Sequence, residues 1–340
     1  MRAVVVRDKR LLVADIPVPE PGPGEVLVRT LACGICGSDL HALKHADRFF
    51  ENYRRPDGTP IADLARDIFM GHEFCAEIVD HGPRTARRLP PGTRVCSMPV
   101  LQRPEGRQAI GYSNDHPGGY AEYMRLTEAL LLEVPNGLAT EQAALTEPMA
   151  VGLHAVNKAR LQAGDKALVV GCGPVGLAVI ASLRLRGIHP IVAVDFSPRR
   201  RELAVTLGAD EAVDPSPAIP PARWRDATVV FECVGVPGVI DQIMAGAPRG
   251  ARVVIVGVCM EPDTIHPLRG ISKELSLQFV LGYDGDEFAA TLRHVAEGAI
   301  PTRPLITGTV GLDGVASAFA ELASPERHAK ILVEPWRERC

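Results

Sequence analysis

At 340 residues the chain is too long for one ordinary hydrophobic core, and at about 150 residues per domain it is expected to form two. Hydrophobic residues make up 46% and charged residues 23%, the balance of a globular protein, and a net charge of −4 gives no electrostatic reason to bind nucleic acid or an anionic membrane surface. Charge follows the first three valines, so no signal peptide is predicted, and the eight cysteines indicate reduced thiols or a metal site and a cytoplasmic location.

The first part of the chain consists of short segments that favour β-strands. Glu25–Thr30 and Ala76–Val79 are two of them. Turns rich in proline and glycine separate such segments at residues 17–24, 90–92 and 117–119. This pattern predicts an irregular β-barrel over residues 1–152.

Beyond residue 152, strands and helices alternate. Apolar runs predict strands at Ala167–Val170, Ile191–Asp195, Thr228–Cys233, Arg252–Val258 and Leu275–Leu281. Helices are predicted at Val175–Arg186, Pro198–Leu207 and Glu287–Glu297, and Ser197 and Pro198 suit the start of the second one. The alternation predicts a parallel sheet with helices on both faces over residues 153–297. A last strand, Lys330–Val333, is expected to return to the first domain, which then comprises residues 1–152 and 298–340.

A glycine-rich turn joins the first of these strands to the helix after it. Its sequence is Gly171-Cys172-Gly173-Pro174-Val175-Gly176. The first glycine permits a tight turn, the second lets the backbone approach a pyrophosphate, and the third lets the helix pack closely on the strand. Asp195 ends the second strand, where its carboxylate can accept hydrogen bonds from ribose hydroxyls. The pattern predicts a dinucleotide site, and a plain glycine turn with a solvated aspartate is the alternative.

Three distant stretches supply side chains of the kinds that bind zinc. Cys36, His72, Glu73 and Glu147 offer a thiolate, an imidazole and carboxylates. Cys33 and Cys36 also form a C-x-x-C pair, which can be redox-active or half of a zinc knuckle, but the chain has no second such pair. A zinc knuckle is therefore not expected. Cys36 is the better ligand because it opens the segment Ser38-Asp39-Leu40-His41, and Cys33 is expected to pack as a small apolar residue. A hydrogen-bonded structural histidine at position 72 and a helix-terminus charge at position 147 are the alternatives.

Together these motifs resemble those of the zinc-dependent medium-chain alcohol dehydrogenases, close to the branch of the sorbitol, threonine and butanediol dehydrogenases. The resemblance covers nearly the whole chain, because four further segments recur in that family in the same order, namely Pro117–Tyr123, Phe231–Gly235, Pro304–Thr307 and Lys330–Val333. It implies an α/β fold class, with a GroES-like irregular β-barrel as the catalytic zinc-binding domain and a doubly wound Rossmann domain for the dinucleotide.

The resemblance implies roles for the residues around the metal. Cys36 and His72 match the zinc ligands of the family. Glu73 matches an adjacent carboxylate that ligates directly or lies just behind the metal. Glu147 matches a position that is Cys in some branches and Glu in the polyol branch. Asp39 matches the carboxylate that orients the ligand histidine.

The resemblance also implies a proton relay and a set of cofactor contacts. Ser38 and His41 match the relay, and Ser38 would take the proton of the alcohol. Contacts to the dinucleotide are implied for Gly171, Gly173, Pro174, Val175, Gly176, Asp195, Arg200, Val234, Gly257 and Val258.

The chain departs from the family pattern in a lobe between residues 92 and 118. Four cysteines often bind a structural zinc there, but only Cys96 is present. One catalytic zinc per chain and no structural zinc are therefore predicted, with the lobe held by packing alone. A second departure is an insertion at residues 45–67, which carries Phe49, Phe50 and Tyr53. It is expected near the mouth of the site, where it would shape substrate choice or oligomer contacts.

The predicted reaction is the NAD-linked oxidation of an alcohol, either a secondary alcohol or a polyol, to a ketone or aldehyde by hydride transfer. Zinc favours this reaction because it lowers the pKa of a hydroxyl that binds it. Asp195 would repel a 2′-phosphate, so NAD is predicted over NADP, although the arginines at 199–201 could clamp a phosphate. Arg200 is expected beside the adenine, with its two neighbours facing solvent.

Three alternatives to this function are a zinc-free quinone or enoyl reductase of the same fold, a non-catalytic nucleotide-binding or crystallin-like protein, and a reductase that works toward the alcohol. The expected partners are a small-molecule alcohol and further copies of the chain, as a dimer or tetramer, with no nucleic acid and no membrane. No motif identifies the alcohol, because one methylene changes the discrimination between substrates by only about 1–3 kcal/mol.

Overall fold

The computed structural model describes residues 1–52, 54, 58–219, 221–324 and 326–337. The chain forms two compact units, one made of Met1–Glu147, Ile306–Ser324 and Lys330–Cys340, the other of Pro148–Leu305 and Pro325–Ala329. The chain thus leaves the first unit after Glu147 and returns to it at Ile306, whereas the boundaries expected from the sequence follow residues 152 and 297.

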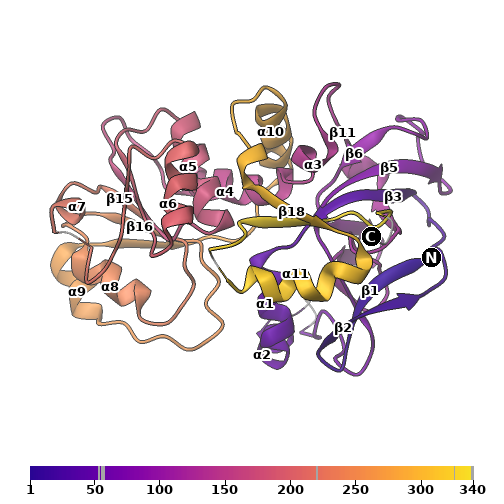
Figure 1. Ribbon diagram of the computed structural model, residues 1–340, viewed down its shortest axis with the longest axis horizontal. Helices are drawn as coiled ribbons and strands as arrows, with labels where there is room; N and C mark the ends of the chain where they lie inside the picture. Colours follow the sequence, from indigo (N-terminus) through magenta and orange to yellow (C-terminus); the bar gives the residue numbers. More distant parts are fainter. Residues whose placement is uncertain (53, 55–57, 220, 325, 338–340) are drawn as a thin grey trace. The chain divides into compact units, whose positions relative to one another are not determined.

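The first unit is built mainly from antiparallel strands (Figure 1). One sheet has the order β2 (Arg10–Asp15), β1 (Arg2–Arg7), β4 (Ile68–Met70) and β9 (Tyr112–Ser113). A second has the order β11 (Leu132–Glu133), β6 (Arg94–Cys96), β5 (Glu73–His81), β3 (Glu25–Gly34), β19 (Lys330–Val333) and β18 (Ile306–Val310), and β10 (Tyr123–Thr127) also pairs with β3. A hairpin is formed by β7 (Val100–Arg103) and β8 (Gly106–Ala109). The helices of this unit include α1 (Gly37–Lys44), α2 (Ala46–Asn52), α3 (Thr140–Ala143) and α11 (Val315–Leu322).

Strand β3 is the centre of the second sheet and brings distant segments together. It pairs with β5 on one side, so that Gly34 lies opposite Glu73. The last strand of the chain, β19, pairs with the same end of β3 through Leu332 and Gly34. Alternate apolar side chains of β3, such as Val26 and Val28, are fully buried, which fixes the register of the strand. The end of β3, the start of β5 and the start of β19 therefore converge.

The second unit contains a parallel sheet with the order β14 (Glu211–Val213), β13 (Ile191–Val194), β12 (Ala167–Val170), β15 (Val229–Glu232), β16 (Arg252–Ile255) and β17 (Ser276–Phe279). Its helices include α4 (Thr146–Lys158), α5 (Pro174–Leu185), α6 (Pro198–Thr206), α7 (Pro221–Arg225), α8 (Val239–Gly246), α9 (Pro267–Lys273) and α10 (Gly285–Ala296). β12 and β15 are buried along their whole length, as in parallel strands covered on both faces. This confirms the predicted doubly wound sheet, whose strand order reverses between β12 and β15.

The predicted strands and helices of the second unit are present, with differences at their ends. Ser197 accepts a hydrogen bond from the Arg200 N–H at 3.2 Å, and Pro198 occupies the first turn of α6, so the predicted cap is confirmed. The strand predicted at Arg252–Val258 ends earlier, at Ile255. It stops there because the next two N–H groups, of Val256 and Gly257, both donate to the Glu232 carbonyl.

The lobe without the four cysteines is joined to the barrel by polar contacts, so the prediction of packing alone is wrong. Arg103 Nε donates to Glu25 at 2.8 Å. The His116 ring contacts Gln108 at 2.5 Å through Nε2 and Arg125 at 2.9 Å through Nδ1. Arg103 and Glu25 are far apart in the sequence, and the partners of His116, 8 and 9 residues away, also lie beyond the reach of a local pattern.

His116 should make the stability of the protein depend on pH. Burial, with the positive charges of Arg103 and Arg125, lowers the pKa of His116 from about 6.5 to about 4. The folded histidine stays neutral while the unfolded one gains a proton, so its contribution is complete above pH 6.5 and is lost as the pH falls toward 4. We expect a loss of about 1–2 kcal/mol, discounted for partial solvent screening. Urea unfolding at pH 6.5 and at pH 4 would measure this loss. His116→Gln should remove this part of the dependence of the unfolding free energy on pH. An unchanged pH dependence in the variant would contradict the role given to His116.

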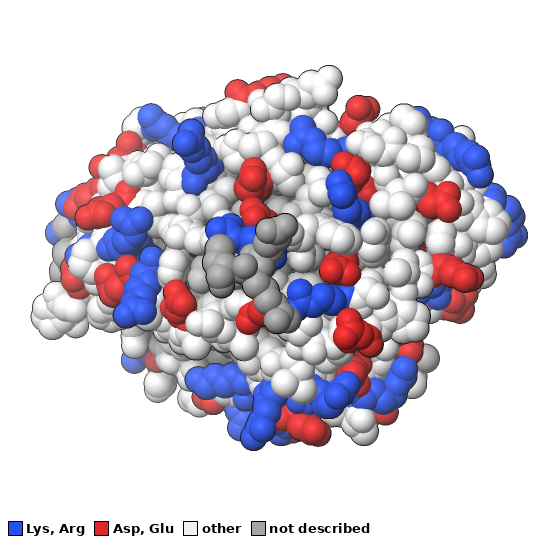
Figure 2. Space-filling view, turned by 45° about the vertical axis from the view of Figure 1, so that its right-hand side comes forward, with Lys and Arg blue, Asp and Glu red and all other residues white. Residues whose placement is uncertain are grey.

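Among the described residues, none of the helices combines the length and the apolar character needed to cross a bilayer. On the face shown in Figure 2, lysine and arginine side chains lie among aspartate and glutamate side chains. That face therefore presents charges of both signs rather than an extended surface of one sign.

Candidate metal centre and nucleotide-binding site

Three of the predicted ligands come together in the first unit. Cys36 is the N-cap residue of α1, His72 directly precedes β5, and Glu73 is the first residue of β5. Their ligand atoms all lie within 4.8 Å of one another. Gly34 makes this approach possible, because a Cβ atom at that position would lie 2.0 Å from a carboxylate oxygen of Glu73. The pairing of β3 with β5 thus brings the carboxylate of Glu73 beside the loop that carries Cys36.

This donor set fits a zinc ion. Zinc prefers thiolate, imidazole and carboxylate ligands at about 2.0–2.3 Å, which places tetrahedral ligand atoms roughly 3.5 Å apart. The three groups need only small shifts to reach that spacing. Burial by itself lowers the pKa of His72, but the negative charges of Asp39 and Cys36 raise it well above its ordinary value. Surroundings that stabilise a protonated imidazole to this extent also stabilise a metal cation.

Asp39 lies directly behind this set and is fully buried. Its Oδ1 atom lies 3.5 Å from Nδ1 of His72, which leaves the other ring nitrogen of His72 facing Cys36. The Cys36 N–H donates to Oδ2 of Asp39 at 3.1 Å, which closes the capping box of α1. One carboxylate thus fixes the loop of Cys36 and faces the ring of His72.

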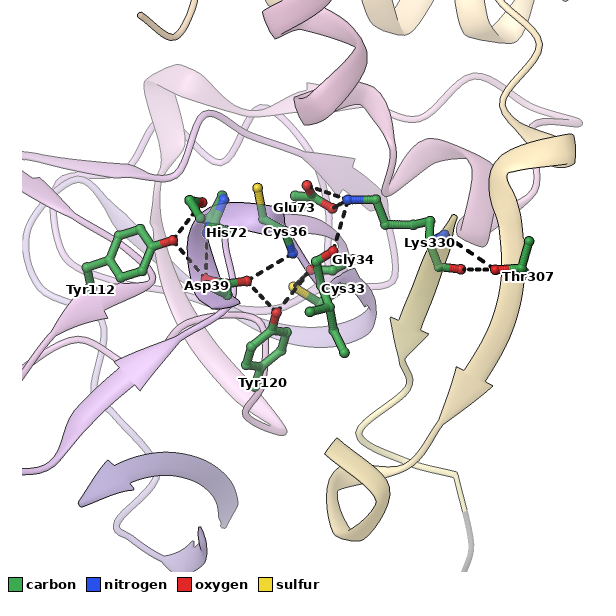
Figure 3. A network of polar contacts seen from close by, with 12 residues as sticks. Cys33, Gly34, Cys36, Asp39, His72, Glu73, Tyr112, Tyr120, Thr307 and Lys330 are labelled. Carbon is green, nitrogen blue, oxygen red and sulfur yellow. Dashed lines mark hydrogen bonds and ion pairs between the residues drawn. The ribbon is translucent and has the colours of Figure 1, made fainter. Parts of the chain in front are cut away.

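Two tyrosines complete the contacts of Asp39 (Figure 3). Tyr120 donates to Oδ2 at 2.6 Å, and the hydroxyl of Tyr112 lies 2.9 Å from Oδ1. Burial, with the negative charge of Asp39, raises the pKa of both phenols well above the ordinary value. Both tyrosines therefore keep their protons at neutral pH and act as hydrogen-bond donors.

Glu73 forms a buried ion pair with Lys330 (Figure 3). The Lys330 ammonium contacts both carboxylate oxygens at 2.8 Å and the Ile35 carbonyl at 3.0 Å. The two side chains are 1% and 0% exposed. Burial alone lowers the pKa of Lys330, yet the charge of Glu73 raises it above its ordinary value, so the pair is charged. A carboxylate has lone pairs to spare beyond these two bonds, so the pairing leaves Glu73 able to ligate a metal.

Glu147 lies near this set but outside the group of ligand atoms within 4.8 Å. It is in the first turn of α4 and is 9% exposed. Its negative charge contributes to the raised pKa of both His72 and Lys330, which places it in their surroundings. Glu147 is therefore a nearby carboxylate that could serve as a further metal ligand.

The predicted relay residues lie on one face of α1. Ser38 and His41 are three residues apart, a spacing that brings side chains together on a helix. Burial, with the positive charges of His45 and Lys44, lowers the pKa of His41. His41 is therefore neutral at pH 7 and has a lone pair that can accept a proton. Cys33 is fully buried in β3, in agreement with the expected apolar role.

The insertion reaches the site through its aromatic residues. Phe49 and Phe50 lie in α2 and are 2% and 4% exposed. The Phe49 ring lies 5.0 Å from that of Tyr112, measured between centroids, and the Tyr112 ring lies 5.3 Å from the imidazole of His72. Tyr53 lies outside the described residues.

Sequence reasoning missed three residues of this site. Lys330 was identified only as the start of a strand, although a lysine that opens an otherwise apolar strand is a signal of a buried partner. Tyr120 appeared within a family motif without a role. Tyr112 had no signal at all, because its partners are defined only by the pairing of β9 with β4.

The glycine-rich turn of the second unit has the shape that a dinucleotide requires. Gly171 has a φ of +94°, which only glycine adopts without strain. A Cβ atom at Gly176 would lie 1.9 Å from the Gly171 carbonyl, so this position requires glycine for close packing. A Cβ atom at Gly173 would meet nothing within 4 Å. That open space lies at the N-terminus of α5, which begins at Pro174 and continues through Val175, and it is where a pyrophosphate would bind.

Asp195 follows β13 and is held rigidly. Its two carboxylate oxygens accept hydrogen bonds from the N–H groups of Cys172 at 2.8 Å and Ser197 at 2.9 Å. Arg200 lies 3.9 Å from the carboxylate, and its Nε atom has no partner among the described residues. Arg201 does not face solvent as predicted, since it donates to the Asp195 carbonyl at 2.8 Å and contacts Asp214 at 3.1 Å. These nearby acceptors draw its side chain back to the loop.

The other predicted cofactor residues follow the next two strands. Val234 comes after β15, and Gly257 and Val258 come after β16. The buried Glu232 carboxylate accepts hydrogen bonds from the N–H groups of Val234 at 2.7 Å and Gly235 at 2.8 Å, which fixes this loop. All predicted cofactor residues therefore lie at the carboxyl edge of the parallel sheet, where ligands bind in such folds.

Comparison with known proteins identifies relatives over the full length. The family model described as zinc-binding dehydrogenase matches residues 174–297, and that of the alcohol dehydrogenase GroES-like domain matches residues 22–136. The chain is 35% identical to (R,R)-butanediol dehydrogenase of Bacillus subtilis (strain 168), over 96% of this chain and 97% of that protein. It is 27% identical to sorbitol dehydrogenase of the same strain, over 99% and 98%.

Solved structures agree with these relatives. The crystal structure of 2R,3R-butanediol dehydrogenase from Bacillus subtilis matches with a TM-score of 0.83 at 33% identity, covering 98% of this chain and 99% of that chain. A protein from Sinorhizobium meliloti 1021, crystallised with NADP, matches with a TM-score of 0.83 at 28% identity and the same coverage.

Proposed function

The chain belongs to the zinc-dependent medium-chain alcohol dehydrogenases, and we propose that it oxidises a secondary alcohol group of a diol or polyol to a ketone, with NAD as the hydride acceptor. As a member it is an NAD(P)-dependent zinc oxidoreductase. The convergence of Cys36, His72 and Glu73 within 4.8 Å, with Ser38 two residues after Cys36, is the observation that carries the proposal. The chain is similar to butanediol and sorbitol dehydrogenases, whose named substrates carry secondary hydroxyl groups. This similarity supports a substrate of the same kind.

We assign the metal ligands to Cys36, His72 and Glu73, with Glu147 as the further carboxylate. Zinc bound there supplies a Lewis acid that lowers the pKa of the alcohol hydroxyl. Asp39 holds the His72 ring so that its other nitrogen faces Cys36. The missing cysteines of the lobe support one zinc per chain.

Ser38 accepts the alcohol proton in this proposal as it gives up its own, and His41, neutral at pH 7, is a further proton acceptor on the same face of α1. A nicotinamide cofactor bound to this chain would take up the hydride that the alcohol carbon loses. The glycine-rich turn Gly171–Gly176 holds the pyrophosphate of that carrier.

We test this function with zinc-replete enzyme and a panel of primary, secondary, polyol and amino alcohols, following NADH absorbance. The vicinal secondary diols and polyols should give the highest kcat/KM. Metal analysis of the same preparation should find one zinc per chain. Activity only toward quinones or enoyl compounds, or two zinc ions per chain, would contradict the proposal.

Asp195→Ala should weaken the preference for NAD over NADP. Two like charges about 4 Å apart at an effective dielectric constant near 20 repel by roughly 4 kcal/mol, and half of that, after screening by Arg200, is about thirtyfold in kcat/KM. Without the carboxylate, Arg200 and Arg199 become available to a 2′-phosphate. The ratio of kcat/KM for the two cofactors measures the effect. Equal kcat/KM values for NAD and NADP in the wild-type enzyme would show that the attraction of the arginines for a 2′-phosphate outweighs the repulsion by Asp195.

We also propose that the chain forms a homo-oligomer through the edge of the parallel sheet. β17 is the terminal strand in the sheet order, and Phe279 at its end is 65% exposed. Leu268 and Ile271 of the neighbouring helix α9 are 73% and 72% exposed. An unpaired strand edge with apolar neighbours favours pairing with a second copy about a two-fold axis. Light scattering should give a dimer or tetramer, and Phe279→Lys should yield smaller species. The cytoplasmic location stays a prediction.

A further inference from the structure

We propose that Tyr112 is a positioning residue, which holds the Ser38 hydroxyl in the orientation that accepts the alcohol proton. The inference rests on the proposed function and adds a residue to it. Tyr112 belongs to none of the motifs that identified the zinc ligands or the relay, and it lies in β9, far from α1 in the sequence.

The hydroxyl of Tyr112 lies between two acceptors of α1. It is 2.8 Å from Oγ of Ser38 and 2.9 Å from Oδ1 of Asp39. Figure 3 shows Tyr112 and Tyr120 approaching the Asp39 carboxylate from different sides. The single hydroxyl of Tyr112 therefore contacts both Ser38 and Asp39, the carboxylate that faces His72.

Counting protons decides the direction of these two hydrogen bonds. A phenol has one proton and cannot donate to both neighbours, and an ionised carboxylate can only accept. Tyr112 therefore donates to Asp39, in a charge-assisted bond. The remaining contact requires Ser38 to donate its own proton to the phenol oxygen of Tyr112.

This direction prepares Ser38 for its role. With its proton held by Tyr112, the Ser38 oxygen presents only lone pairs to its other neighbours. An oxygen in that state can accept the alcohol proton without first rotating. As it does so, Ser38 gives its own proton to the Tyr112 oxygen, and the phenol proton of Tyr112 passes to Asp39. If Tyr112 lost its hydroxyl, Ser38 would be free to turn, and its own proton would face the alcohol for part of the time.

Aromatic packing from the insertion fixes Tyr112 itself. The rings of Phe49 and Phe50 lie 5.0 and 6.5 Å from the Tyr112 ring, measured between centroids, and both are almost fully buried. On the strand side, Tyr112 pairs with Met70 of β4. The insertion thus acts on the relay through the ring of Tyr112, which gives Phe49 and Phe50 a role in the reaction.

Tyr120 provides a matched control within the same network. It also donates to Asp39, at 2.6 Å, and its second contact is the Gly34 carbonyl at 3.2 Å. Among the described residues, no hydrogen bond links it to Ser38. Tyr112→Phe and Tyr120→Phe each remove one donor to Asp39, and only the first removes the partner of Ser38.

We would compare the two variants as zinc-loaded, full-length enzymes. Both should bind zinc about tenfold to a hundredfold more weakly in chelator competition, because both weaken the support of His72 through Asp39. Only Tyr112→Phe should lower kcat by about tenfold to a hundredfold with nearly unchanged KM, and only this variant should raise the solvent deuterium isotope effect on kcat. In a Ser38→Ala background, Tyr112→Phe should cause no further loss of kcat.

Equal losses of kcat in the two tyrosine variants would overturn the proposal, because both would then act through Asp39. A wild-type kcat and isotope effect in Tyr112→Phe would overturn it as well. Crystal structures of the zinc-loaded variants give a readout that needs no turnover. Ser38 should leave its rotamer or occupy several in Tyr112→Phe and keep one in Tyr120→Phe. If no alcohol is oxidised by the wild type, the proposed function fails, and the Ser38 rotamer still decides the role of Tyr112.

Discussion

Cys36→Ala and His72→Ala are each expected to lower turnover by on the order of a thousandfold or more. Either change removes a ligand from the set within 4.8 Å, and with it the Lewis acid, whose effect on the barrier is several kcal/mol. Dinucleotide binding should remain largely intact, because the glycine-rich turn belongs to the second unit. NADH absorbance, metal analysis and calorimetric titration with NADH measure the three properties.

Cys33→Ala is the matched control for this loss. Cys33 is a buried cysteine of the same C-x-x-C pair, but it lies in β3 and outside the ligand set. The variant should keep its zinc and most of its activity. If Cys36→Ala or His72→Ala retained full activity, the metal assignment would be wrong.

Lys330→Met is expected to lower the free energy of unfolding by about 3–5 kcal/mol, because it leaves the buried carboxylate of Glu73 without its partner. For a unit of this size that corresponds to a fall of about 10 °C in the thermal midpoint. Thermal unfolding followed by circular dichroism measures it. The double variant Lys330→Met with Glu73→Gln should recover much of the stability, since no uncompensated charge then remains.

Lys9→Met provides the control for Lys330→Met. The ion pair of Lys9 with Asp47 has the same N to O distance, 2.8 Å, but its side chains are 57% and 64% exposed. Its loss should cost less than about 1 kcal/mol. Similar thermal midpoints for Lys330→Met and Lys9→Met would contradict the proposal that burial makes the loss of the Glu73 ion pair more destabilising.

Local sequence was sufficient for the second unit. Apolar runs such as Ala167–Val170 and the cap at Ser197 and Pro198 encode their structure within a few neighbouring residues, and these elements are present as predicted. The same holds for the glycine-rich turn, where the required conformation at Gly171 and the close packing at Gly176 are properties of a single short segment. Strand ends were less accurate, as at Ile255, because the next two amides both donate to the carbonyl of Glu232, the last residue of β15.

In the first unit, residue types indicated zinc chemistry, but not the arrangement of the groups. Cys36, His72 and Glu73 stood out because thiol, imidazole and carboxylate together are rare outside metal sites. The expectation that packing alone holds the lobe failed at Arg103, whose partner Glu25 is distant in the chain, and at His116, which contacts Gln108 across a loop. The expectation for Arg201 failed because the Asp195 carbonyl and Asp214 bind its side chain.

The sequence by itself determined the family, the two kinds of fold and the choice of candidate metal-binding side chains, because these depend on residue type and short-range spacing. Only the tertiary structure decided that Lys330 neutralises Glu73 and that Tyr112 reaches Ser38. Both contacts arise where strands pair across the chain, Lys330 through β19 on β3 and Tyr112 through β9 on β4. A lysine or a tyrosine in a short strand is compatible with many partners, and burial beside one particular carboxylate or hydroxyl gives it a role.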